Sequence, residues 1–102
     1  MNTDLFQYLR KRRGGKNVKS GVLLGRKVKG RVLVGWSKCK LTGKNPDTFD
    51  VQRGLDIAQG RIQSFVDEHR NGHQVPPSIE DNLKKFVNRC KRYFKVKKVK
   101  VV

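Results

Sequence analysis

The stretch SIEDNLKKFVNRCKRYF, residues 78–94, carries the clearest structural signal in this chain of 102 residues. Its apolar side chains recur at spacings of four, three, four and four residues, at Ile79, Leu83, Phe86, Cys90 and Phe94. This spacing places them on one stripe of an α-helix, and Ser78 with Asp81 forms a variant of the capping box at its start. The opposite side carries Lys84, Lys85, Asn88, Lys91, Arg92 and Lys95. A disordered tail would not keep an apolar stripe in phase with a basic one, so we expect a packed helix with its cationic face outward.

A second amphipathic pattern comes earlier in the chain. Its apolar residues are spaced by four, three, four and three, at Val51, Leu55, Ala58, Ile62 and Phe65. Asp47 or Thr48 is placed to cap this helix, and Asn71-Gly72 is a suitable end for it. Gly54 and Gly60 lie inside it, and each weakens a helix by ~1 kcal/mol relative to Ala. Close approach to a neighbouring element and simple tolerance are both open as reasons for these glycines.

The segment before the helices has the pattern of a β-hairpin. Two apolar, partly β-branched runs, 22–24 and 32–34, predict antiparallel strands at about 18–24 and 31–40. The connection 25–30 has a glycine at each end and would project Arg26, Lys27 and Lys29. Alternation puts Val32, Val34 and Trp36 on one face and Leu33, Cys39 and Leu41 on the other. The pattern leaves open whether both faces are buried.

The two ends of the chain are less clearly patterned. Asn2-Thr3-Asp4 is suited to cap a short, frayed helix with Leu5, Phe6 and Leu9, which Gly14-Gly15 would stop. Residues 95–102 are β-prone and fit either a third strand on the hairpin or a mobile basic arm. A third strand would help, because an isolated hairpin is marginally stable in water. We therefore predict a basic N-terminal segment, 1–15, and a single small α+β domain, 16–102, in which a β-hairpin packs on two amphipathic helices.

The charge of the chain is strongly positive and unevenly distributed. With 25 Lys and Arg against 8 Asp and Glu, the formal net charge is +17. Residues 1–44 hold 13 Lys and Arg and one acid, Asp4, whereas residues 83–102 hold nine and no acid. Residues 45–82 hold three arginines and seven acids. A domain with this balance is expected to bind polyanions through its two basic ends, and nucleic acid is the commonest polyanion.

Several classes of protein fit the sequence poorly. It has no run of ~18 apolar residues, so we expect no membrane span, and its start lacks the features of a signal peptide. Two cysteines are too few for a disulfide scaffold, which favours a reducing cytoplasm. His69, His73, Cys39 and Cys90 are weak evidence for a zinc site, because a helix end and Gly72 interrupt their spacing. Neither a phosphate loop nor a nucleophile–base pair is recognisable, so we expect no metal, no cofactor and no catalysis. Asp47, Asp50 and Asp56 are better explained as helix caps and solvated helix surface than as metal-binding acids.

About a quarter of the chain resembles short bacteriophage-encoded proteins of unassigned function. Their pattern is roughly Gly-Trp/Phe-Ser-x-Cys, then Asp-x-Phe, then Gly-x-x-Ile-Ala-x-Gly-Arg. The positions that match are Gly35, Trp36, Ser37, Cys39, Asp47, Phe49, Gly54, Ile57, Ala58, Gly60 and Arg61. The resemblance implies a phage origin, the cytoplasm of an infected bacterium, and a small accessory or host-takeover role. It implies no activity.

The first hypothesis is that the chain binds the phosphate backbone of nucleic acid with little sequence preference. DNA is slightly favoured over RNA. The candidate binding residues are Arg10, Lys11, Arg12, Arg13, Arg26, Lys27, Lys29, Arg31, Lys84, Lys85, Arg89, Lys91, Arg92 and Lys95. Trp36 and Tyr93 are candidates for stacking on bases, although burial in the core is the commoner role of an aromatic side chain.

Two other hypotheses use the same charge. The basic faces of a phage inhibitor would bind an acidic host protein, since charge complementarity speeds association and selects the partner. Alternatively, a structural protein of the virion or of a ribosome-like particle would use its charge to condense nucleic acid. Oligomeric state does not follow from the sequence.

Overall fold

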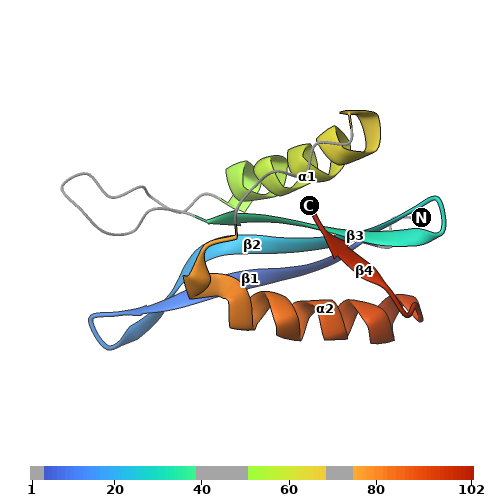
Figure 1. Ribbon diagram of the computed structural model, residues 1–102. Coiled ribbons are helices and arrows are strands. Elements are labelled where there is room, and N and C mark those ends of the chain that lie inside the picture. Colours follow the sequence, from blue (N-terminus) through green and yellow to red (C-terminus); the bar gives the residue numbers. More distant parts are fainter. Residues whose placement is uncertain (1–3, 39–50, 69–74) are drawn as a thin grey trace.

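The structure is a computed structural model that describes residues 4–38, 51–68 and 75–102. In these ranges the chain forms, in order, β1 (Leu5–Arg13), β2 (Lys16–Val28), β3 (Arg31–Lys38), α1 (Val51–Glu68), the short 3-10 helix η1 (Pro77–Ile79), α2 (Glu80–Phe94) and β4 (Val99–Val101). These strands form one sheet in the order β1-β2-β3-β4, with β1, β2 and β3 antiparallel and β4 parallel to β3. Figure 1 shows the sheet with α1 on one side and α2 on the other. The predicted small α+β domain is confirmed.

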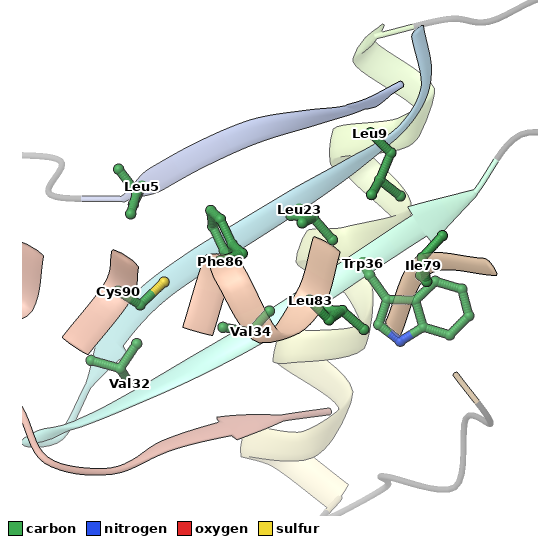
Figure 2. Packing of buried hydrophobic residues seen from close by; sticks show 10 residues of the cluster. All are labelled: Leu5, Leu9, Leu23, Val32, Val34, Trp36, Ile79, Leu83, Phe86 and Cys90. Atoms are coloured by element: carbon green, nitrogen blue, oxygen red, sulfur yellow. The ribbon is translucent and has the colours of Figure 1, made fainter. Parts of the chain in front are cut away.

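Both faces of β2 and β3 are buried, which settles the question that alternation left open. On one face Leu23, Val32 and Val34 pack with Phe86 and Cys90 of α2 (Figure 2). On the other face a second cluster joins strand residues to α1, and it consists of Leu24, Leu33, Ala58, Ile62, Phe65 and Val102. Burial on two faces explains why 22–24 and 32–34 are continuous apolar runs and not alternating ones.

The predicted N-terminal helix is wrong, because residues 5–13 form β1. Leu5 and Leu9 are buried on the α2 side of the sheet, and their spacing of four residues suits a helix face but also, being even, one face of a strand. Gly14 and Gly15 do not stop a helix. Their φ angles of 58° and 79° build the two-residue turn of the β1–β2 hairpin, a conformation that glycine adopts without strain.

The connection between β2 and β3 is also shorter than predicted. β2 continues to Val28, and the turn consists of Lys29 and Gly30. Gly25 therefore lies within the strand, where an added Cβ would come 2.7 Å from the Sγ atom of Cys90. This glycine is required by the approach of α2 and not by the turn.

Of the two alternatives for the C-terminal end, the structure confirms the added strand. Val99–Val101 forms β4 and pairs with Val32–Val34 of β3. The backbone N–H of Val102 donates to the carbonyl of Val34 at 2.9 Å, and the Val102 side chain is buried against the α1 side. Because β4 seals part of the outer edge of β3, these residues complete the core.

Beyond β4, a side chain of α1 continues to cover the edge of β3. The Arg61 guanidinium donates to the carbonyl of Trp36 at 2.9 Å, two residues past the carbonyl that Val102 uses. The same guanidinium lies over the Trp36 ring, 3.9 Å from its centroid. Desolvation at this site lowers the pKa of Arg61. Arg61 thus occupies the edge position where a longer β4 would otherwise bind.

Close backbone packing brings α1 onto β3. A Cβ at Gly35 would lie 2.2 Å from the carbonyl oxygen of Ala58, and one at Gly54 would lie 2.9 Å from a Val22 methyl. Close approach is therefore the reason for Gly54, whereas Gly60 has no neighbour that a Cβ would meet within 4 Å. Gly35 and Gly54 thus have a packing role.

Candidate nucleic-acid interface

One end of the domain brings together cations from three separate parts of the chain. The β2–β3 turn marks this end, and because β3 and β4 are parallel and Val32 pairs with Val99, β4 starts beside it. Residues 95–98 join the end of α2 to β4, so they lie there too (Figure 1). We call the exposed cations at this end the basic end: Lys27, Lys29, Arg31, Arg92, Lys95, Lys97 and Lys98. No acid occurs in residues 27–46 or 83–102.

Two lysines of the basic end occupy backbone conformations that disfavour them. Lys29 has φ 50° and Lys95 has φ 55°, and among the described residues no other non-glycine residue has positive φ. Left-handed conformations cost an L-residue about 1–2 kcal/mol relative to the right-handed ones. At both positions the turn would form more readily with a residue other than lysine.

The local geometry shows which residues the backbone prefers. Lys29 and Gly30, both with positive φ, form a two-residue hairpin turn of the kind that favours Asn-Gly. At the end of α2, the N–H groups of Lys95 and Val96 both donate to the carbonyl of Lys91. This is a Schellman-type ending, in which the position of Lys95 is usually glycine. Both positions thus hold an exposed lysine in place of the Asn or Gly that the turn favours.

The basic surface continues from the basic end along α2. Lys84, Lys85 and Arg89 are exposed on this helix, and Arg89 donates to the side-chain oxygen of Gln7 at 2.9 Å, which holds it toward β1. The acids of α2, Glu80 and Asp81, are confined to its first turn. There they complement the positive end of the helix dipole and leave the rest of the helix cationic.

The other side of the domain is less basic. α1 carries exposed acids at Asp56, Asp67 and Glu68. Near its C-terminal end, Arg31 and Lys100 lie over the ring of Phe65, at 5.0 and 5.3 Å from the centroid. The surface of α1 therefore mixes acids with cations, whereas the exposed surface of α2 beyond its first turn carries no acid.

One of the predicted binding residues is engaged within the protein. Arg26 forms an ion pair with Asp4 at 2.7 Å, with hydrogen bonds to both carboxylate oxygens. The hydrogen bond to Asp4 raises the pKa of Arg26. Its charge is therefore neutralised locally, and we remove Arg26 from the candidate interface.

Apart from Lys84, Lys85 and Arg89 on the exposed surface of α2, the remaining predicted residues lie at the basic end, within α2 or on β1. Lys27, Lys29, Arg31, Arg92 and Lys95 belong to the basic end, and Lys91 is half-buried on α2. Arg10 is exposed on β1, away from the basic end. The backbone of Lys11, Arg12 and Arg13 continues β1 to the Gly14–Gly15 turn, whereas the positions of their side chains lie outside the description.

The two predicted stacking residues have different environments. Trp36 is only 6% exposed and belongs to the core cluster, with Arg61 over its ring, so it presents no free face to a base. Tyr93 is 52% exposed on α2 and packs edge-on against Phe94 at 4.8 Å. Tyr93 stays a candidate for stacking.

The candidate metal and nucleophile residues offer no site within the described ranges. Cys39, Asp47, Phe49, Asp50, His69 and His73 lie outside those ranges. Cys90 is fully buried, and burial raises its thiol pKa to about 11, so the thiol is protonated and unreactive at neutral pH. Asp56 accepts a hydrogen bond from Gln52 on the helix surface. In residues 4–38, 51–68 and 75–102, no cluster of three His, Cys, Asp or Glu side chains is placed to hold a metal.

Sequence reasoning missed residues whose placement depends on strand pairing. Lys97 and Lys98 join the basic end, and Lys100 lies near it, only because β4 pairs with β3. Phe6 and Tyr8 are surface residues of β1 and not of a helix. The usable signal was Gly14-Gly15 between two basic, β-prone segments, which is typical of a hairpin turn.

Comparison with known protein families, curated proteins and solved structures finds no match to this chain. Neither α1 nor α2, nor any other helix in the described part of the chain, has the length and hydropathy to cross a membrane.

Proposed function

We propose that this protein binds nucleic acid, without catalysing a reaction, through the basic end and the adjoining cationic face of α2. The observation that carries the proposal is the convergence of the β2–β3 turn, the end of α2 and residues 95–98 at one end of a folded domain. Seven exposed cations meet there with no acid among the segments that supply them. A polyanion with closely spaced charges is the partner such a surface suits best.

The two lysines with left-handed backbone support this assignment. Residues in sparsely populated conformations persist at functional sites, where the surrounding structure holds them in place. Asn at position 29 and Gly at position 95 would relieve the strain, so a stability requirement alone does not account for lysine at either position. Contact of both ammonium groups with phosphate accounts for both.

The chemistry of the surface indicates how it would recognise its ligand. Lysine and arginine bind phosphate oxygens, which fix orientation but carry no sequence information. The basic end presents few amide side chains, and these are the groups that read adenine edges. We therefore expect strong dependence on salt and weak dependence on sequence, with DNA slightly favoured over RNA.

The phage resemblance suggests the setting for this activity. A short basic protein made in the cytoplasm of an infected bacterium would meet both genomic and viral nucleic acid. The same cations also fit the two alternatives, inhibition of an acidic host protein and packaging within a virion or ribosome-like particle. These alternatives make different predictions about which partner survives nuclease treatment.

The direct test compares charge removal at two places by fluorescence anisotropy with labelled duplex DNA. Lys98→Gln removes one charge from the basic end, and Arg53→Gln removes one from exposed α1. We expect Lys98→Gln to weaken binding about five- to tenfold at 0.1 M salt, and Arg53→Gln to have little effect. Equal effects of the two variants would contradict the proposed surface.

A second experiment tests the class of partner. The tagged protein is incubated with a nuclease-treated bacterial lysate and recovered. The proposal predicts that the protein recovers no stoichiometric partner from this lysate, because the nuclease has degraded the nucleic acid that it binds. A stoichiometric acidic protein that survives nuclease would instead establish the inhibitor hypothesis, and presence of the chain in purified phage particles would establish the structural one.

A further inference from the structure

One flank of the sheet exposes aromatic side chains that the fold does not use in its core. α1 packs over β2 and β3, and the adjoining face of β1 on the same side carries Phe6 and Tyr8. Phe6 is 36% exposed and Tyr8 is half-buried. Their rings pack edge to face, with centroids 4.7 Å apart and an interplanar angle of 76°. The Phe6 ring therefore has an open surface beside a second ring that fixes its orientation.

Exposed cations border these rings. The Lys19 ammonium lies 4.1 Å from the centroid of the Tyr8 ring, and the Arg10 guanidinium lies 6.0 Å from it. Arg10 and Lys19 pair with each other across β1 and β2. The carboxylate that precedes Phe6 on this face, Asp4, is neutralised by Arg26 at 2.7 Å. The patch thus combines aromatic rings with two exposed cations.

We propose that Phe6, whose ring Tyr8 holds edge to face, forms a base-stacking platform for single-stranded nucleic acid, with Arg10 and Lys19 contacting its phosphates. This inference rests on the proposed function and specifies the class of nucleic acid. Aromatic side chains at alternate positions of a strand project from the same face of a sheet and offer stacking surfaces to unpaired bases. Bases in a duplex are already stacked on one another, so the platform selects single strands.

The charge of the neighbouring hairpin favours the same ligand. Residues 10–19 hold six Lys and Arg and no acid, and they form the β1–β2 hairpin that continues from the platform (Figure 1). A strand with a base stacked on Phe6 would follow this basic hairpin with its backbone. A second copy of the chain is a poorer occupant, because it would bring a net charge of +17 against a cationic patch.

The test uses oligo-dT and an abasic oligonucleotide of equal length, since both have the same phosphates but only one has bases. We expect the wild type to bind oligo-dT about five- to 100-fold more tightly than the abasic strand. Phe6→Leu combined with Tyr8→Leu should abolish most of that difference and leave duplex binding unchanged, because it removes no charge. Phe6→Trp should preserve the difference, and Ile57→Ala, an exposed apolar residue of α1, is the matched control. Circular dichroism and thermal melting check that each variant is folded.

The outcomes separate failure of the platform from failure of the proposed function. Equal affinity of the wild type for oligo-dT and the abasic strand would overturn the platform while leaving nucleic-acid binding intact. Absence of binding to any strand or duplex would overturn the proposed function. A dimer that Phe6→Leu dissociates would overturn the platform in favour of a subunit interface.

Discussion

Replacing Lys29 with Asn and Lys95 with Gly should make the protein more stable and, at the same time, a weaker binder of nucleic acid. Both lysines have left-handed backbone, with φ 50° and 55°, at positions that turn chemistry assigns to Asn and Gly. The double variant Lys29→Asn/Lys95→Gly keeps both turns and removes two charges from the basic end. Stability and binding should therefore change in opposite directions.

The expected gain in stability follows from the backbone. Removing the backbone strain of a lysine in the left-handed conformation contributes about 1–2 kcal/mol to the free energy of unfolding. At position 95, the extra freedom of glycine in the unfolded chain offsets about 0.5–1 kcal/mol of this gain. Together the two changes should raise the free energy of unfolding by about 1–2 kcal/mol. For a domain of this size, that corresponds to an increase in Tm on the order of 5–10 °C.

The expected loss of binding follows from the charges. Each phosphate contact that is removed makes the negative slope of log K against log salt less steep by about 0.9 for duplex DNA. Two lost contacts change a slope of about −5 to about −3, and each weakens binding by about tenfold at 0.1 M salt. Thermal melting measures the first effect, and anisotropy titrations over a range of salt measure the second.

A charge-preserving variant separates backbone strain from binding. Lys29→Arg/Lys95→Arg retains both cations and both strained positions, so its Tm and its salt slope should match the wild type. The reasoning is refuted if the Asn/Gly variant binds duplex as tightly as the wild type, because the two lysines would then have no role in binding. It is also refuted if that variant melts at a lower temperature.

The remaining predictions test the packing that holds the interface. Arg61→Ala should lower stability by about 1–3 kcal/mol in chemical denaturation, and Arg61→Lys should not restore it, because a lysine cannot both stack on Trp36 and donate in plane to its carbonyl. Gly25→Ala should destabilise the fold by about 1–3 kcal/mol, since the new Cβ would lie 2.7 Å from the Cys90 Sγ. Adding Cys90→Ala should recover part of this loss. If the effects of the two substitutions on stability simply add, the contact is not the cause. Cys90, whose pKa burial raises to about 11, binds a proton more tightly in the folded state. The contribution of the protonated thiol to the free energy of unfolding is therefore complete below about pH 8.5, the ordinary thiol pKa. It is lost as the pH rises toward 11. The stability difference between wild type and Cys90→Val, measured by urea denaturation, should decline over that range, and a constant difference would contradict the burial argument.

The sequence predicted those elements whose burial pattern is local. Each helix has its apolar residues on one stripe, and Ala58, Ile62, Phe86 and Cys90 are buried as their spacing requires. The order of β2 and β3 followed equally well from their apolar runs. For these elements, periodicity and burial carry the same information.

β1 was not predicted, because its two buried residues fit two structures. Leu5 and Leu9 are four residues apart, which is compatible with a helix and with a strand, and their environment is decided by pairing with β2 over the whole length of β1. The capping signal at Asp4 was misleading, since its carboxylate binds Arg26 across the sheet. Long-range pairing therefore overrode a local preference.

Only part of the candidate interface was predicted, and the reason is similar. The cationic face of α2 is visible as a sequence pattern, and Lys29 and Lys95 were both named as binding residues. Their convergence with Lys97 and Lys98 depends on the parallel pairing of β4 with β3, which no local pattern reveals. The same holds for the ion pair that neutralises Arg26, because Asp4 is 22 residues away in sequence.

The central claim is that the basic end binds the phosphate backbone, and the salt dependence of duplex affinity tests it most directly. Anisotropy titrations of the wild type with one labelled duplex, repeated between 50 and 300 mM salt, give the slope of log K against log salt. If the basic end neutralises about six phosphates, the slope should be close to −5, and a duplex of unrelated sequence should give the same value. A slope near zero would contradict the claim.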